Sequence, residues 1–184
     1  MSKTTEVSLP EIYLLQTKLT LCTQQQLLNM IVVAIQRQNK QLVLSGNVYS
    51  FNLAYENKWL RDFLNQADVV RLDGAGLRLG AKILGISAPP RMTWADFAWD
   101  LAQLCVENDF SLYFLGGKPG VAERAAAKLQ TKYPTLRLAG CHHGYFDKTA
   151  GGTENETVIT AVNDARPDIL LIEDLGCLFR KNGS

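Results

Sequence analysis

Paired cysteines and long apolar runs are both missing from this sequence, and each absence excludes a class of protein. The 184 residues contain four cysteines that lie far apart and form no C-x-x-C pair, so the sequence indicates no zinc framework. Scattered cysteines in a chain of this length are typical of a reducing cytosol. No run approaches the roughly 18 apolar residues of a membrane-spanning helix, and the first residues lack the apolar centre of a signal peptide. Any contact with a membrane is therefore expected to be peripheral.

An excess of charge of one sign is missing as well. The chain has 19 Lys and Arg against 18 Asp and Glu, which gives a net charge of +1. This balance argues against a protein that holds nucleic acid through bulk charge, whereas a small anionic ligand needs only a local site. The sequence also lacks a D-x-D triplet, the usual carboxylate clamp for a metal ion and a nucleotide sugar. A metal-dependent site of that kind is not expected.

Short apolar segments alternate with amphipathic ones from residue 41 to the end of the chain. The apolar segments are continuous, which is typical of parallel strands covered on both faces. The sequence therefore predicts a single α/β domain over 1–184, with a Rossmann-like, mostly parallel sheet, helices on both faces and a small N-terminal hairpin over 11–21. Helices are expected over 23–38 (with Thr23 as cap), 48–67, 76–85, 94–109, 119–134 and 153–167, and strands over 40–47, 68–72, 110–117, 136–140 and 168–172.

Several candidate residues follow the predicted strands. Ligands of parallel sheets bind beyond the carboxyl ends of the strands, and Ser45, Asp73, the pair Gly116 and Gly117, and the loop from Cys141 all fall there. For Asp73, the local sequence leaves two interpretations open. Asp before Gly is a common turn pair, but a carboxylate at a strand end is also well placed for catalysis.

The segment "LGGKPGVAE", residues 115–123, joins a predicted strand to a predicted helix. Its glycines would let a phosphate approach the backbone and the helix N-terminus, although a tight turn explains them equally well. The segment lacks the GK[ST] ending of a P-loop and the GxGxxG pattern, and the next strand does not end in an acidic residue, so a nicotinamide-dependent dehydrogenase is disfavoured. The adjacent His142 and His143 are expected to point in different directions, with one of them near a ligand. Arg91 is either an anion-binding residue or an exposed loop residue.

Five segments, taken together in order and spacing, are more specific than any one of them alone. They read "SGN", "LDGAG", "PPRMTWAD", "YFLGGKPGVAERAAAKLQTKYPTLRLAGCHHGYF" and "RPDILLI". Over about residues 20–172 the chain resembles the WecG/TagA/CpsF family of glycosyltransferases. The resemblance implies inverting, metal-independent transfer of a sugar, of the N-acetylmannosamine type or related, from a UDP-sugar to an undecaprenyl-diphosphate-linked acceptor. It places this reaction in cell-surface polysaccharide or teichoic acid synthesis, peripherally on the cytoplasmic face of the membrane, without a cofactor and with a homo-oligomer left open.

The same resemblance assigns roles to individual residues. Asp73 falls on the family's "DG" aspartate, which is regarded as the general base that takes the proton of the acceptor hydroxyl. Substrate-binding roles are implied for Ser45, Asn47, Gly74, Gly76, Arg91, Thr93 and Asp96. Nucleotide-binding roles are expected for Gly116, Gly117, Gly120, His143, Tyr145 and Phe146, and no metal ligand is implied.

The chain departs from the family pattern at three places. Ser45 stands where the family often has threonine, and Trp94 replaces a glycine, which affects the local loop shape. After residue 172 the chain reads "EDLGCLFRKNGS" in place of a "G-x-G-x-P-x-Q-E" element and a basic tail. We therefore expect an atypical segment over 173–184, weakened membrane contact and poor transfer, with a nucleotide-sugar-binding but inactive protein as the alternative.

Overall fold

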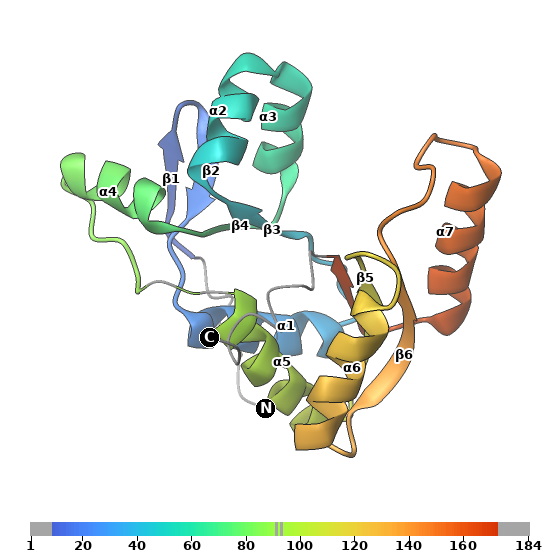
Figure 1. The fold of residues 1–184 in the computed structure, drawn as a ribbon. Coiled ribbons are helices and arrows are strands. Elements are labelled where there is room, and N and C mark those ends of the chain that lie inside the picture. Colours follow the sequence, from blue (N-terminus) through green and yellow to red (C-terminus); the bar gives the residue numbers. More distant parts are fainter. Residues whose placement is uncertain (1–8, 91, 93, 173–184) are drawn as a thin grey trace, which may run out of the picture. The chain divides into compact units, whose positions relative to one another are not determined.

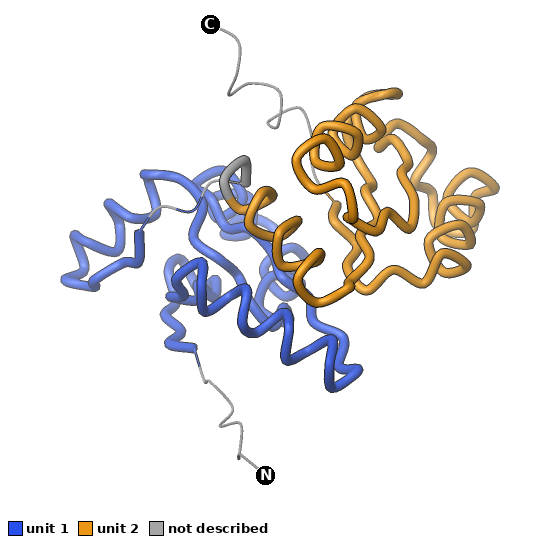
Figure 2. The backbone as a smooth tube through the Cα atoms, turned by 90° about the horizontal axis from the view of Figure 1, so that it is seen from below, with its two compact units in different colours: residues 1–93 blue, residues 94–184 orange. Residues whose placement is uncertain are grey.

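A computed structural model describes residues 9–90, 92 and 94–172, with only the backbone described over 94–96. The chain forms two compact units, 1–93 and 94–184, which Figure 2 colours blue and orange. The single domain expected over 1–184 stays a prediction.

The sheet of the first unit has four strands in the order β1-β2-β4-β3 (Figure 1). Strands β1 (Glu11–Leu14) and β2 (Thr17–Thr20) form the predicted antiparallel hairpin, and Leu15 and Gln16 make its turn with φ of 49° and 63°. Strands β3 (Val43–Gly46) and β4 (Val69–Leu72) are parallel, and β4 is also parallel to β2. The mixed sheet therefore joins the small N-terminal β element to the parallel strands that carry the first candidate residues.

The described residues of this unit form four helices: α1 (Gln24–Gln36), α2 (Val48–Glu56), α3 (Lys58–Gln66) and α4 (Ala75–Ile83). The predicted cap of α1 is confirmed, because the Thr23 side chain accepts the N–H of Gln26 while the Gln26 side chain accepts the N–H of Thr23. One hydrophobic core cluster joins β2 and β4 to α2, α3 and α4, and its buried residues are Leu19, Phe51, Ala54, Leu64, Ala67, Val70, Leu72 and Leu77.

The prediction of one helix over 48–67 is wrong, because the helix breaks at Asn57. This residue has extended backbone angles, φ −115° and ψ 102°, and its side-chain amide donates to the carbonyl of Leu53 at 2.9 Å. The guanidinium of Arg61 donates to the carbonyls of Ala54 and Tyr55. The bonds from Arg61 satisfy carbonyl groups at the end of α2, while the Leu53 carbonyl also accepts the main-chain N–H of Asn57 at 2.8 Å. Side chains therefore stabilise a break that hydrophobic periodicity does not reveal.

The second unit alternates strands and helices: α5 (Trp94–Asn108), β5 (Ser111–Leu115), α6 (Val121–Lys132), β6 (Arg137–His142), α7 (Thr153–Ala165) and β7 (Ile169–Ile172). Its three strands are parallel in the order β6-β5-β7. The connections run from β5 outward to β6 and then back across to β7, so right-handed crossovers place α6 and α7 on opposite faces. Figure 1 draws them on opposite sides of β6. The Rossmann-like α/β prediction is confirmed.

Several boundaries in this unit differ from the predictions by a few residues, and those of α6 and β6 lie beside candidate residues. Pro119 precedes α6, which begins at Val121 after a cap at Gly120. Strand β6 continues to His142, so Cys141 and His142 belong to the strand and not to the following loop. Within β6, a Cβ on Gly140 would lie 2.5 Å from the Tyr113 ring, and the pairing of β5 with β6 shifts register at this point. A glycine is needed here because the aromatic ring occupies the space of a side chain.

Candidate functional site

Asp73 stands at the carboxyl end of β4, directly beside the end of β3. Its N–H donates to the carbonyl of Gly46 at 2.8 Å, which continues the pairing of the two strands by one residue. Its side chain is 29% exposed, so the carboxylate is neither sealed in the core nor fully solvated. The strand pair therefore presents a partly accessible carboxylate at the sheet edge where ligands of parallel sheets bind.

Gly74 and Gly76 turn the chain from Asp73 into α4. Gly74 has φ 91°, a conformation that side chains rarely adopt, and it caps α4 without a side-chain hydrogen bond. A Cβ on Gly76 would lie 2.3 Å from Cγ2 of Val48, the first residue of α2. The two glycines therefore allow the first turns of α2 and α4 to meet beside the ends of β3 and β4. These contacts explain both glycines by backbone geometry, and their predicted substrate contacts stay predictions.

Asn47 follows β3 and caps α2. Its side-chain oxygen accepts the N–H of Ser50 at 2.9 Å, and the Ser50 hydroxyl accepts the N–H of Asn47 at 3.0 Å. Ser45 is half-buried and pairs with Arg71 in the register of β3 and β4. The structure thus gathers Ser45, Asn47 and Asp73 at one edge of the sheet. The predicted strand ends indicated this for Ser45 and Asp73, whereas Asn47 was named only by the family resemblance.

Arg71 is a residue of this site that the sequence reasoning missed. Its side chain is only 1% exposed, and its Nη2 lies 3.6 Å from Oδ2 of Asp73. Its Nη1 donates to the main-chain carbonyl of Met92 at 3.0 Å. A buried guanidinium needs such partners because desolvation of its charge is costly. Arg71 therefore holds the carboxylate of Asp73 from the protein side, and a charged residue inside the apolar run "ADVVRL" was the signal that could have revealed it.

The charge of Arg71 acts on a second group in the same unit. Burial raises the pKa of the Cys22 thiol, and the nearby guanidinium of Arg71 opposes this rise. Met92, which is buried and accepts the hydrogen bond from Arg71, belongs to the "PPRMTWAD" segment. The predicted substrate-binding residues Arg91 and Thr93 and the side chain of Asp96 lie outside the described residues. Met92 is therefore the residue of that segment that contacts the site, through its hydrogen bond with Arg71 of β4.

The glycine-rich loop after β5 and the loop after β6 are joined by main-chain hydrogen bonds. Gly116 donates its N–H to the carbonyl of His142 at 2.9 Å, and Gly144 donates to the carbonyl of Gly117 at 2.8 Å. A Cβ on Gly144 would lie 3.2 Å from Cα of Gly116, so the two backbones approach closely. Gly120 then caps α6 with φ 80°. The second unit therefore brings the predicted nucleotide-binding glycines together at the amino end of α6, where backbone N–H groups favour an anion.

The loop after β6 carries the remaining predicted nucleotide contacts. His143 Nδ1 accepts the N–H of Tyr145 at 3.3 Å, and His142 Nδ1 lies 2.8 Å from the carbonyl of His143. The two imidazole rings lie with their centroids 4.5 Å apart, so the expectation that they point in different directions is wrong. Both rings turn toward the same short loop because their Nδ1 atoms bond to its main chain. Within the described part of the chain, no group of three or more His, Cys, Asp or Glu residues is placed to hold a metal ion.

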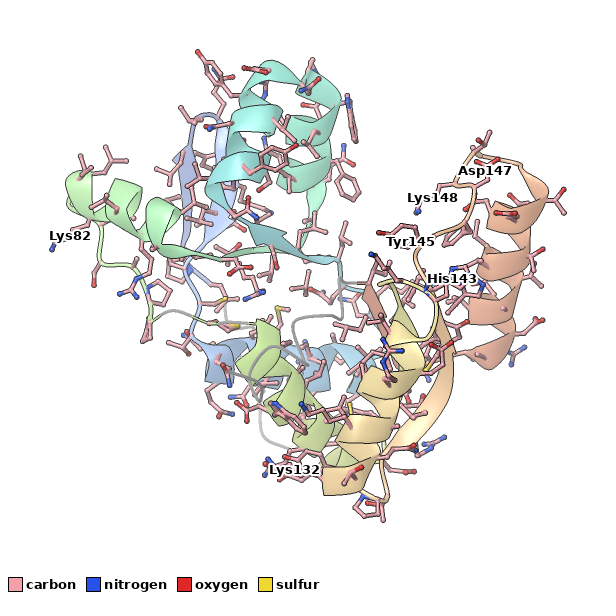
Figure 3. All side chains as sticks on the ribbon, viewed as in Figure 1. Lys82, Lys132, His143, Tyr145, Asp147 and Lys148 are labelled. Carbon is pink, nitrogen blue, oxygen red and sulfur yellow. The ribbon has the colours of Figure 1, made fainter. Side chains whose placement is uncertain are left out.

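Lys148 is a second residue that the sequence reasoning missed. Its ammonium donates to the carbonyl of Gly144 and lies 4.7 Å from the centroid of the Phe146 ring. Phe146 also packs edge-on against His142 at 5.6 Å, whereas Tyr145 is 65% exposed. Figure 3 shows Tyr145, Lys148 and His143 along the connection from β6 to α7. The loop therefore combines a cation, a packed aromatic ring and an exposed aromatic ring beside the glycines.

Asp147 fixes the far end of this loop to α7. Its carboxylate accepts hydrogen bonds from the hydroxyl and the N–H of Thr149 at 2.6 and 2.9 Å, and these bonds lower its pKa. The N–H of Asp147 donates to the Glu154 carboxylate at 2.7 Å. The loop shape is therefore set by its own polar side chains on one side and by the glycine contacts on the other.

The contact between Arg71 and Asp73 is tested by a double-mutant cycle on the free energy of unfolding. We expect Arg71→Met and Asp73→Asn to be coupled by about 1 kcal/mol, because each change leaves a partner with its charge uncompensated. The matched control is the exposed pair Arg137 and Asp109, which lie closer, at 3.2 Å, but with side chains 54% and 83% exposed. Solvent screening should hold their coupling below about 0.5 kcal/mol. Equal coupling in the two cycles would contradict the role given to Arg71.

Two glycines of α4 provide a test of the close approach between α4 and α2. Gly76→Ala should destabilise the protein by about 1–3 kcal/mol, because the new methyl group overlaps Val48. Gly80→Ala lies on the same helix with no atom within 4 Å of its Cβ position, and it should stabilise by roughly 0.5–1 kcal/mol through helix propensity. Thermal and urea unfolding measure both. A Gly76→Ala protein as stable as the Gly80→Ala protein would show that the two helices do not meet as described.

Known proteins share sequence similarity with most of this chain. The model of the glycosyl transferase WecG/TagA/CpsF family matches residues 12–174. Proteins of Staphylococcus aureus strains NCTC 8325, COL and N315 are 26% identical over 139 residues, which cover 76% of this chain and 52% of each relative. Each is named N-acetylglucosaminyldiphosphoundecaprenol N-acetyl-beta-D-mannosaminyltransferase. The chain thus spans about half the length of the curated relatives it matches. Since the family match extends over most of the sequence, the chain belongs to the WecG/TagA/CpsF family of glycosyl transferases.

Proposed function

We propose that this chain transfers an N-acetylmannosamine-type sugar from a UDP-sugar to an undecaprenyl-diphosphate-linked acceptor, with inversion and without a metal ion, in teichoic acid or cell-surface polysaccharide synthesis. The observation that carries the proposal is the partly exposed carboxylate of Asp73, held by the buried Arg71 at the end of β4 in a chain of this family. The names of the Staphylococcus aureus relatives support the choice of sugar and acceptor.

In the proposed reaction, Asp73 acts as the general base. The acceptor hydroxyl attacks C1 of the donor sugar from the face opposite UDP, and its proton passes to the Asp73 carboxylate. The bond between C1 and the diphosphate oxygen breaks, and its electron pair leaves with UDP. Arg71 does not reach the reacting atoms, since it is buried behind Asp73, so its part is to fix the orientation of the carboxylate. Ser45, Asn47, Gly74 and Gly76 border the same edge and are the proposed contacts to the sugars.

UDP is proposed to bind at the joined loops of the second unit. The diphosphate would lie against Gly116, Gly117 and Gly120, where the amino end of α6 favours negative charge. Lys148 adds a positive charge beside Gly144. Tyr145 is sufficiently exposed to stack on the uracil ring. His143 would hold the loop by accepting the N–H of Tyr145, and Phe146 by packing edge-on against His142. This arrangement supplies charge and hydrogen-bond donors for a diphosphate without a metal ion.

The acceptor lipid implies work at a membrane surface, which we propose to be the cytoplasmic face. None of the helices in the described ranges is long and apolar enough to cross a bilayer. The contact would therefore be peripheral.

The change Asp73→Asn tests the proposal. It preserves size and turn hydrogen bonding but cannot take the proton, so transfer should fall by about 10²–10⁴ while UDP affinity barely changes. Circular dichroism at the assay temperature checks that the variant is folded, because loss of the carboxylate charge beside Arg71 lowers stability. The matched control is Asp68→Asn at the opposite end of β4, where Asp68 accepts the N–H of Leu42 and lies away from the site. Transfer is measured with UDP-N-acetylmannosamine and a soluble analogue of the lipid acceptor, and UDP binding by calorimetry with and without EDTA.

The outcomes separate the parts of the proposal. Near-normal transfer by Asp73→Asn would leave Asp73 as a turn residue only. Loss of UDP binding on chelation would contradict the metal-free site. UDP binding without transfer in the unchanged chain would favour the second candidate, a nucleotide-sugar-binding protein that lacks turnover.

A further inference from the structure

Helix α4, which follows Asp73 directly, has large apolar side chains on its solvent side. Leu77 and Ala81 face the core and are 7% and 0% exposed. Leu79 lies two residues after Leu77, and Ile83 lies two residues after Ala81, so both are on the opposite face of the helix. They are 60% and 76% exposed. Leu84, at the end of the helix, is 61% exposed. A water-exposed helix face normally carries polar residues, so this face is an unusual place for three large apolar side chains.

Positive charge lies beside these apolar residues. Arg78 and Lys82 are both exposed on α4, and Figure 3 shows Lys82 pointing away from the sheet of its unit. The sequence has no Asp or Glu between Gly74 and Ala95, so no acidic neighbour along the chain offsets these cations. A hollow of about 420 Å³ lies between α4 and the segment that follows it, and is lined by Ala75, Arg78, Leu79, Lys82, Ile86, Ser87 and Ala88. The cations and the apolar side chains therefore share one surface.

We propose that this α4 surface, formed by Arg78, Leu79, Lys82, Ile83 and Leu84, docks the protein onto an anionic phospholipid membrane. Leu79, Ile83 and Leu84 would enter the boundary between headgroups and acyl chains, and Arg78 and Lys82 would contact lipid phosphates. Apolar residues next to cations on one helix face are what an interfacial helix needs. The inference rests on the proposed function in one respect, that the acceptor substrate resides in a membrane.

Charge and size favour a membrane over a second copy of the chain. A symmetric dimer through this face would bring the Arg78 and Lys82 side chains of the two copies together, and their like charges would repel. Three apolar side chains also fall well short of the roughly 800 Å² per partner that a stable protein interface buries. An anionic leaflet instead attracts both cations and accepts the apolar groups.

The position of α4 gives this surface a functional consequence. The helix begins at Ala75, two residues after Asp73, and contains nine residues. It is therefore about 13 Å long from the end next to Asp73 to its C-terminal end. A protein docked through α4 would therefore hold Asp73 close to the leaflet. A sugar attached to a lipid through a diphosphate would lie at the same membrane surface, within reach of Asp73.

Vesicle sedimentation tests the proposal in the absence of donor and acceptor. The unchanged chain should bind vesicles of phosphatidylglycerol mixed with phosphatidylcholine, and bind weakly to phosphatidylcholine alone. Arg78→Ser with Lys82→Ser should lower the partition coefficient about 30-fold on the anionic vesicles, and added salt should weaken binding of the unchanged chain. The charge-matched control removes Lys40 and Lys128, two lysines outside α4, and should retain most of the binding.

The apolar part of the surface has its own matched pair. Ile83→Ser should weaken binding roughly tenfold, whereas Ile159→Ser on α7, where the isoleucine is 43% exposed, should leave it unchanged. Leu79→Ser provides a second variant if Ile83→Ser unfolds the chain, and circular dichroism checks the fold of each. Equal vesicle binding by the α4 variants and their controls would overturn the proposal. The proposal would also be overturned if the unchanged chain did not bind vesicles but self-associated in solution, and Ile83→Ser abolished that self-association.

The proposal for the transfer reaction and the proposal for the docking surface can be refuted independently. Asp73→Asn should bind vesicles as well as the unchanged chain does, because Asp73 lies outside the α4 surface. A chain that docks but does not transfer would refute the proposed function and retain this inference. A chain that transfers to a soluble acceptor but does not dock would do the reverse.

Discussion

The ion pair between Arg71 and Asp73 is the interaction on which the candidate site of the first unit depends. A guanidinium that is 1% exposed is costly to bury, so the end of β4 must supply its partners. Its Nη1 donates to the Met92 carbonyl, which ties the strand end to the "PPRMTWAD" segment, and its Nη2 lies 3.6 Å from the Asp73 carboxylate, an ion-pair contact longer than a hydrogen bond. The carboxylate is thereby held on its inner side and open on its outer side. In the proposed reaction, a buried neighbour of this kind would orient Asp73 without sealing it from the substrate.

Close approach of backbones is the second constraint, and glycine makes it available in both units. Gly76 lets α4 meet Val48 at the start of α2, and Gly144 lets the loop after β6 lie against Gly116. In each case a methyl group would occupy the space of a neighbouring segment. The same arrangement leaves helix N-termini and main-chain N–H groups near the sheet edges, which is the chemistry that a diphosphate requires. Glycines at these places are therefore also required by the close packing of the backbone.

Much of the fold was predictable because its strands are continuous apolar runs and its helices are capped or periodic, as Thr23 and α1 illustrate. The break at Asn57 was not, since it depends on side chains that bond to carbonyls of the preceding helix. At the site, the predicted strand ends located Asp73 directly after β4 and Ser45 near the end of β3, and their substrate roles stay predictions. Arg71 was missed because period and composition do not distinguish a buried cation from an exposed one. The paired histidine rings were misjudged because their hydrogen bonds to the loop backbone are tertiary detail.

Chemical rescue tests the central claim, that Asp73 held by Arg71 is the base, most directly. Asp73→Ala removes the carboxylate but leaves the Arg71 guanidinium beside the vacated space, where it should attract a small anion such as formate. The account predicts that formate restores transfer in Asp73→Ala saturably, that more basic carboxylates of similar size restore it better, and that the unchanged chain is not stimulated. Formate that stimulates both proteins equally, or neither, would contradict the claim.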